Sequence, residues 1–107
     1  MSYHSVIAGV LDSQYPNSST TTTINISRLN LKFIPLQSQP LLEQYSRLTT
    51  LAITKCHLRN LENFPRIATL TQLDLSHNEL LGTLRFLMPL LQLTYLDLSN
   101  NMIQQEK

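Results

Sequence analysis

The chain is poor in residues on which many enzymes and disulfide-stabilised proteins depend. Its 107 residues include one cysteine (Cys56), two glycines and no tryptophan. A lone cysteine excludes an internal disulfide and favours a reducing compartment. No apolar run reaches the length of a membrane span, and the start MSYHSVIAGVL lacks the basic residues that open a signal peptide. We therefore expect an intracellular protein that does not enter a membrane.

Charge is also scarce, since only 14% of the residues are charged and the formal net charge is +1. A protein that binds nucleic acid through a strong basic field carries far more positive charge than this. The low charge therefore argues against direct binding of nucleic acid. The length is that of one small domain.

Leucine is abundant, with 22 copies, and it recurs at fixed positions. Three stretches read L-x-x-L-x-L-x-x-(N/C)-x-(L/I): LTTLAITKCHL (48–58), LTQLDLSHNEL (70–80) and LTYLDLSNNMI (93–103). They follow one another at an almost constant interval, and a weaker copy, ISRLNLKFIPL (26–36), precedes them at the same interval. This is the signature of leucine-rich repeats, whose period is about 20–29 residues.

The repeats predict an α/β fold, a short right-handed leucine-rich repeat solenoid. Each L-x-L segment alternates as a short strand, and successive strands form a parallel concave sheet. Apolar residues recur at every third position between the strands, which predicts 3₁₀ or short helical returns on the convex side. The predicted repeats are residues 26–47, 48–69, 70–92 and 93–107, together forming a leucine-rich repeat domain over 26–107.

An asparagine position follows each strand, where the chain turns. A buried amide there can donate to and accept from backbone groups, so stacked copies form a ladder. Asn78 and Asn101 occupy this position, and Cys56 replaces asparagine in the preceding copy. Ile34 occupies it in the copy at 26–36, which we therefore interpret as a degenerate terminal repeat.

Residues 1–25 differ from the repeats. SYHSVIAGVLDSQY (2–15) is compatible with an amphipathic helix that has Val6, Val10 and Leu11 on one side, and residues 13–23 form a loop rich in Ser and Thr. The first repeat of a solenoid needs a cover for its leucines. We interpret residues 1–25 as an N-terminal cap. An unstructured tail is the alternative.

The sequence contains no catalytic arrangement. Cys56, His57 and His77 form a conceivable metal site, but the repeat spacing separates them, and a turn cysteine with two surface histidines is the better interpretation. Asp74 and Asp97 occupy equivalent positions on adjacent strands. Paired carboxylates can perform acid–base chemistry, but an open sheet does not exclude water. We predict no enzymatic activity, no cofactor and no metal.

The exposed side of the strands is the predicted partner-binding surface. A rigid curved sheet displays many side chains at little cost in ordering, and aromatic residues such as Tyr95 and Phe33 are the best anchors. The predicted contact residues are Arg28, Lys32, Thr50, Lys55, Gln72, Asp74, His77, Tyr95, Asp97 and Asn100.

The second half of the sequence resembles the acidic leucine-rich nuclear phosphoprotein 32 family. The resemblance rests on L-x-x-L-x-L-S-x-N over 70–78, a return containing Gly82, and L-T-x-L-x-L-S-x-N-x-I over 93–103. It implies a nuclear or cytoplasmic scaffold that binds proteins such as histones and phosphatases. The sequence lacks that family's acidic tail and C-terminal cap after Ile103, which weakens the expectation of histone chaperoning.

Two other functions are compatible with the same repeats. An uncapped last repeat would expose leucines and a strand edge, so the chain would form a homodimer through Leu96, Leu98 and Ile103. The repeat class is also similar to that of the spliceosomal A-prime protein, which works with an RNA-binding partner.

Overall fold

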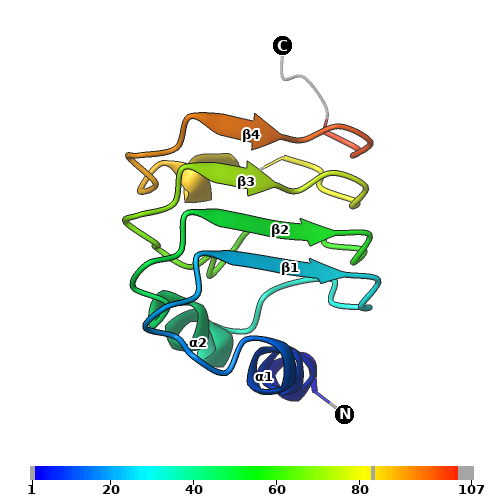
Figure 1. Cartoon of the computed structure of the whole chain (residues 1–107). Helices are drawn as coiled ribbons and strands as arrows, with labels where there is room; N and C mark the ends of the chain where they lie inside the picture. The colour runs from blue at the N-terminus through cyan, green and yellow to red at the C-terminus, as the bar shows by residue number, and fades with distance from the viewer. Residues whose placement is uncertain (1, 83, 104–107) are drawn as a thin grey trace.

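The leucine repeats form a stack of four parallel strands. The structure is a computed structural model, and it describes residues 2–82 and 84–103, so the end of the predicted last repeat lies outside the described residues. The strands pair in chain order as one sheet, so that each repeat lies on the preceding one (Figure 1). The chain thus has the α/β leucine-rich repeat fold. The strands are β1 (Thr23–Ser27), β2 (Thr50–Thr54), β3 (Gln72–Asp74) and β4 (Tyr95–Asp97).

The core lies behind one face of the sheet. Ile24, Leu51 and Leu73 occupy equivalent positions on β1, β2 and β3, and none of the three is exposed to solvent. Full burial of one such side chain contributes about 2 kcal/mol to the free energy of unfolding. The residues between them on each strand point to the opposite, solvent-facing side.

Short helices and turns return the chain from one strand to the next. The structure has η1 (Leu36–Ser38), α2 (Gln39–Glu43) and η2 (Leu84–Leu87) in the returns. The return between β2 and β3 consists of turns, and its apolar residues are buried as the three-residue spacing predicts. They are Leu58, Leu61, Phe64, Ile67 and Leu70.

The predicted register of the first repeat is wrong. β1 pairs Ile24 with Leu51 and Ile26 with Ile53, so the first copy is TTTINISRLNL (21–31) rather than 26–36. Leu29 takes the position given to Ile34, and the predicted division between residues 25 and 26 falls inside β1. The alignment is wrong because L-N-L over 29–31 resembles the strand motif. A left-handed residue, Arg28 (φ +63°), ends the extended segment before it.

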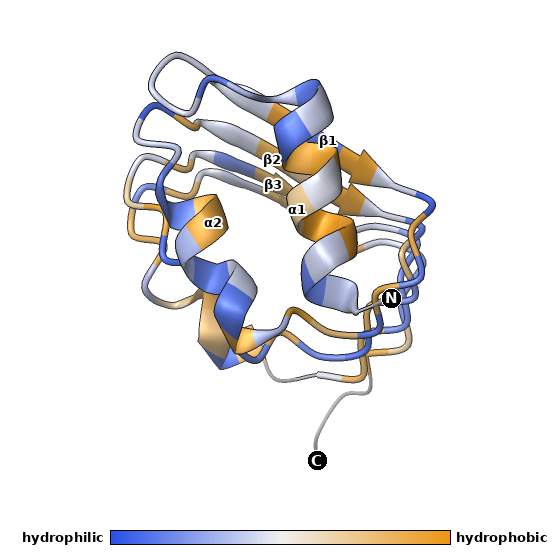
Figure 2. Ribbon diagram, turned by 90° about the horizontal axis from the view of Figure 1, so that it is seen from below, coloured by the Kyte–Doolittle hydropathy of each residue, from blue (hydrophilic) through white to orange (hydrophobic). Residues whose placement is uncertain are grey.

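The predicted N-terminal helix is present as α1 (Tyr3–Gln14). Ser2 caps it, since its side chain accepts a hydrogen bond from the Ser5 amide at 3.1 Å. Ile7 and Leu11 are its buried residues, and Val6 and Val10 pack partly against the core. Figure 1 shows α1 and α2 below β1, at one end of the stack, and Figure 2, seen from that end, shows both helices in front of the sheet.

Candidate functional site

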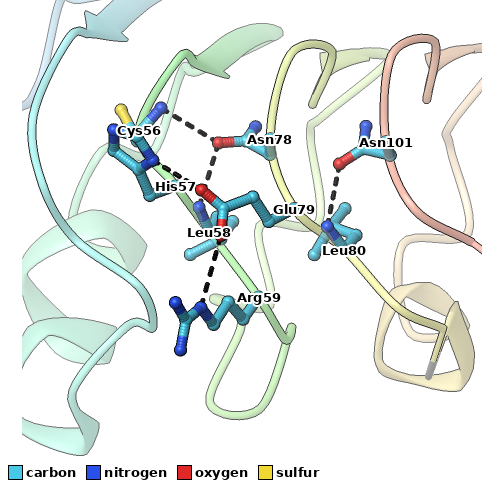
Figure 3. A network of polar contacts seen from close by, with 8 residues as sticks. All are labelled: Cys56, His57, Leu58, Arg59, Asn78, Glu79, Leu80 and Asn101. Atoms are coloured by element: carbon cyan, nitrogen blue, oxygen red, sulfur yellow. Dashed lines mark hydrogen bonds and ion pairs between the residues drawn. The ribbon is translucent and has the colours of Figure 1, made fainter.

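An asparagine ladder fixes the turns that follow the strands, as the sequence predicts (Figure 3). The Asn78 side chain is buried, and its Oδ1 accepts hydrogen bonds from the backbone amides of Cys56 (3.0 Å) and Leu58 (3.2 Å). Its Nδ2 donates to the carbonyl of Ile53 at 2.7 Å. Asn101 Oδ1 accepts from the Leu80 amide in the same way, at 3.0 Å. The ladder therefore fixes the turns after β2, β3 and β4 relative to one another.

Just before the ladder, four equivalent residues adopt the same left-handed conformation. Arg28, Lys55, His77 and Asn100 have φ values of +63°, +56°, +57° and +58°. The sequence pattern places all four on the strands, but each lies one to three positions beyond a strand end. All four are exposed. They therefore line the margin of the sheet formed by the carboxyl-terminal ends of the strands, rather than its face.

Lys32 is also displaced from its predicted place. It lies beyond the end of β1, in the loop toward η1, and it is half-buried. The cause is the shifted register of the first repeat. The Arg59 amide donates to the Lys32 carbonyl at 2.7 Å, so these two residues are neighbours in adjacent repeats.

The other predicted contact residues lie on the solvent-facing side of the strands. Thr50, Gln72 and Tyr95 form one row across β2, β3 and β4. Tyr95 is the most prominent of them, with 54% of its surface exposed. The predicted anchor Phe33 is exposed too, but it lies outside the sheet and packs edge-to-face on Tyr3, with ring centroids 4.9 Å apart.

Asp74 and Asp97 stand side by side in the register of β3 and β4, as predicted. Each carboxylate accepts a hydrogen bond from the backbone amide two positions on, from Ser76 and Ser99 respectively, at 2.9 Å in both cases. The Ser99 hydroxyl adds a bond of 2.7 Å to Asp97. The hydrogen bonds from Ser99 lower the pKa of Asp97. A lowered pKa keeps this carboxylate ionised, which disfavours a general acid at this position.

Glu79 joins two side chains of the preceding repeat. It accepts from His57 Nδ1 at 2.5 Å and from Arg59 Nε at 3.4 Å (Figure 3). The hydrogen bond from His57 is the main cause of its lowered pKa, and Arg59 adds to the effect. His57 is thus directed at a carboxylate in the adjacent repeat rather than at Cys56.

Cys56 is fully buried behind the turn. Its Sγ donates to the Thr54 carbonyl at 3.1 Å, and burial raises the pKa of its thiol. His77 instead approaches Asn100, with 3.5 Å between Nε2 and Nδ2. Over residues 2–82 and 84–103, no cluster of His, Cys, Asp or Glu has the arrangement of a metal site.

The residues of the predicted self-association edge differ in exposure. Leu96 and Ile103 are each 38% exposed, although Leu73, the equivalent of Leu96 on β3, is completely buried. Leu98 is only half-exposed and packs partly against the core. In the part of the chain that the structure describes, β4 pairs with β3 on one side and with no strand on the other. Leu96 and Ile103 thus add apolar surface at this end of the stack.

Sequence reasoning missed the solvent-facing residues of β1. Thr23, Asn25 and Ser27 pair with Thr50, Ala52 and Thr54 and extend the polar face by one strand. The alternation of Ile24 and Ile26 is the signal that could have revealed them. Isoleucine replaces leucine there without changing which face is buried.

Comparisons of the sequence place the chain among known proteins. A family model described as "Leucine Rich Repeat" matches residues 69–90 and 92–107. The chain is also 42% identical over 71 residues to "Acidic leucine-rich nuclear phosphoprotein 32-related protein 1" of Oryza sativa subsp. japonica. That match covers 64% of this chain but 15% of the relative. None of the helices within the described residues has the length and apolar character needed to cross a bilayer.

Proposed function

Because the chain is a leucine-rich repeat protein resembling the acidic leucine-rich nuclear phosphoprotein 32 family, we propose that it is a non-catalytic module for binding other proteins. Leucine-rich repeats of this kind act as protein-interaction scaffolds. The proposed location is the nucleus, the cytoplasm or both, and the name of the rice relative points to the nucleus.

The observation that carries the proposal is the solvent-facing row of Thr50, Gln72 and Tyr95 across three strands. Strand pairing already fixes the backbone that carries these side chains. Binding of a partner therefore requires little further ordering of the chain. Tyr95 offers an exposed aromatic ring with a hydroxyl, a side chain enriched at the centre of protein interfaces. The sheet face therefore has an anchor residue on a rigid support.

The test is retention of proteins from nuclear and cytosolic extracts on the immobilised chain. We expect a set of proteins that the wild-type chain retains and that the double variant Gln72→Ala, Tyr95→Ala loses. Met88→Ala is the matched control, because Met88 is 75% exposed but follows η2 in a return, away from the strands. Retention that is equal for both variants would contradict a binding site on the sheet face. Recovery of an RNA-binding protein would favour the spliceosomal alternative.

Histones are the specific partner class that the resemblance suggests. Asp74 and Asp97 form a small acidic site on the sheet face that could pair with a lysine or arginine of a histone tail. We expect purified histones to bind weakly and to be released by salt. The variant Asp74→Asn, Asp97→Asn should abolish this binding, and binding that survives it would contradict the assignment of histones to this site.

We propose that α1 acts as the N-terminal cap of the repeats. Its support is the burial of Ile7 and Leu11 at the β1 end of the stack. The Tyr45 hydroxyl also donates to the Tyr15 carbonyl at 2.7 Å, which ties the end of α1 to the first return. Deletion of residues 1–15 should therefore cause aggregation or loss of the cooperative unfolding transition.

A homodimer through the β4 end is the alternative function. It is favoured by Leu96, which is 38% exposed where the equivalent Leu73 is fully buried. Light scattering over a dilution series would give the solution mass. If the mass is that of a dimer, Leu96→Asp should yield monomers and Leu36→Asp, at an exposed residue near the β1 end, should not. A monomer at every concentration would rule the dimer out.

A further inference from the structure

Four of the eight lysine and arginine residues gather along one margin of the sheet. They occupy two pairs of equivalent positions in the first two repeats. Arg28 and Lys55 come directly after β1 and β2, and Lys32 and Arg59 lie one turn farther along the chain. We call this set of Arg28, Lys32, Lys55 and Arg59 the basic edge.

Backbone hydrogen bonds keep the basic edge together. The Arg28 amide donates to the Thr54 carbonyl at 3.2 Å, and the Arg59 amide donates to the Lys32 carbonyl at 2.7 Å. Adjacent strands lie about 4.8 Å apart, so the equivalent side chains start from neighbouring backbones. Arg28 and Lys55 have nearly equal φ values, +63° and +56°, so both side chains leave the sheet in a similar direction.

Little negative charge balances these residues. Among the described side chains, the ion pairs at this margin are those of Glu79, which contacts Arg59 and His57. Arg28 and Lys55 are exposed, and neither has a carboxylate within 4.0 Å among the residues described. Two cations thus start from neighbouring backbone positions, and within the described residues neither has a carboxylate partner.

Arg28 and Lys55 also adopt a backbone conformation that is unfavourable for arginine and lysine. Left-handed conformations favour asparagine or glycine, and other residues adopt them at a cost. Asn100 fills the equivalent position beside β4, whereas Arg28 and Lys55 accept the less favourable conformation. Asparagine at positions 28 and 55 would therefore stabilise the folded chain, but it would remove the two positive charges.

We propose that the basic edge binds an acidic, extended segment of a protein partner. Carboxylates of Asp or Glu would pair with Arg28 and Lys55, and Lys32 and Arg59 would extend the contact toward the return loop. Like charges repel, so a basic histone tail would avoid this margin. A nucleic acid would need a wider positive field than a chain of net charge +1 provides.

This inference rests on the proposed function as a binding module, but it concerns different residues from the sheet face. Loss of binding in the Gln72→Ala, Tyr95→Ala variant tests the module, and the variants below test the basic edge. The two can therefore fail separately.

The experiment measures fluorescence anisotropy of a short fluorescein-labelled peptide of alternating Glu and Asp, with the whole chain as titrant. The matched Gln/Asn peptide and a single-stranded RNA of equal charge serve as comparison probes. We expect binding of the acidic peptide that weakens with salt. Arg28→Asn, Lys55→Asn should reduce its affinity about tenfold, while thermal unfolding shows a stability that is unchanged or higher.

The control variant is Arg47→Gln, Arg66→Gln, which removes the same charge from two exposed arginines outside the basic edge. It should leave the affinity for the acidic peptide within about twofold of the wild-type value. Equal losses in both variants would overturn the proposal, because net charge alone would then explain binding. Absence of peptide binding by the wild-type chain would overturn it as well, and so would tighter binding of the RNA.

Discussion

The hydroxyl group of Tyr15 bonds to both backbone groups of Asn25. It accepts from the Asn25 amide at 2.9 Å and donates to the Asn25 carbonyl at 3.2 Å. Asn25 is in β1, an edge strand, so these two backbone groups would otherwise be open to pairing with another chain. One side chain from the end of α1 therefore occupies the open side of the sheet.

Tyr15→Phe should loosen this edge without unfolding the core. We expect amide exchange at Asn25 to become faster and the free energy of unfolding to fall by about 1 kcal/mol. Hydrogen exchange measured by NMR would show whether the effect is confined to β1. Tyr95→Phe, on the solvent-facing side of β4, is the control and should leave exchange at Asn25 as it is in the wild type. Unaltered exchange in Tyr15→Phe would show that the hydroxyl does not protect the strand.

Asn78→Ala should be among the most damaging single substitutions. It removes the partners of the Cys56 and Leu58 amides and leaves them buried without hydrogen bonds. We expect a loss of about 3 kcal/mol in the free energy of unfolding, measured with urea. Asn101→Ala should cost less, because Asn101 is only half-buried. Equal costs at the two positions would contradict the role of burial.

Stability should fall in acid partly through Glu79. Its pKa is lowered in the folded chain, first by the hydrogen bond from His57 and then by Arg59. The contribution is therefore present above the ordinary glutamate pKa and is lost as the pH falls through the lowered value. Melting temperatures of the wild type and of Glu79→Gln should converge toward low pH. A difference between them that stays constant across the acid range would show that Glu79 does not carry this dependence.

The thiol of Cys56 should react slowly in the native chain. The residue is fully buried and burial raises the pKa of its thiol, so thiolate is scarce and inaccessible at neutral pH. Its labelling rate with a disulfide reagent should rise by orders of magnitude in urea. The urea-unfolded chain is the reference, and native labelling at the same rate would contradict a buried thiol.

Leucine spacing predicts the register of the last three repeats correctly. Leu51, Leu73 and Leu96 are paired as the spacing requires, and the Asn78 and Asn101 amides bond as expected. The first repeat is misplaced because its buried strand residues are isoleucines and because its period is longer than the next one. Periodicity alone could not detect an insertion inside a degenerate copy.

The basic edge could not be foreseen from the sequence. Arginine and lysine seldom adopt a positive φ, so the residue types at Arg28 and Lys55 give no sign that the strand has ended before them. The turn geometry there is imposed by the stacking of the repeats and, at Lys55, also by Asn78, which bonds to the Cys56 and Leu58 amides. The partner-binding role of the face residues remains a prediction.

Within residues 2–82 and 84–103, each strand pairs only with the strands next to it in sequence. The molecule is thus a short linear array in which every repeat draws its stability from the repeats beside it. Among the described residues β1 and β4 each have one strand neighbour, whereas β2 and β3 each have two. The open side of β1 is occupied by the Tyr15 hydroxyl, and in the described residues β4 has no comparable cover. We expect opening fluctuations to begin at β4 and to travel toward β1, so that a partner covering the β4 end would slow the unfolding of the whole array.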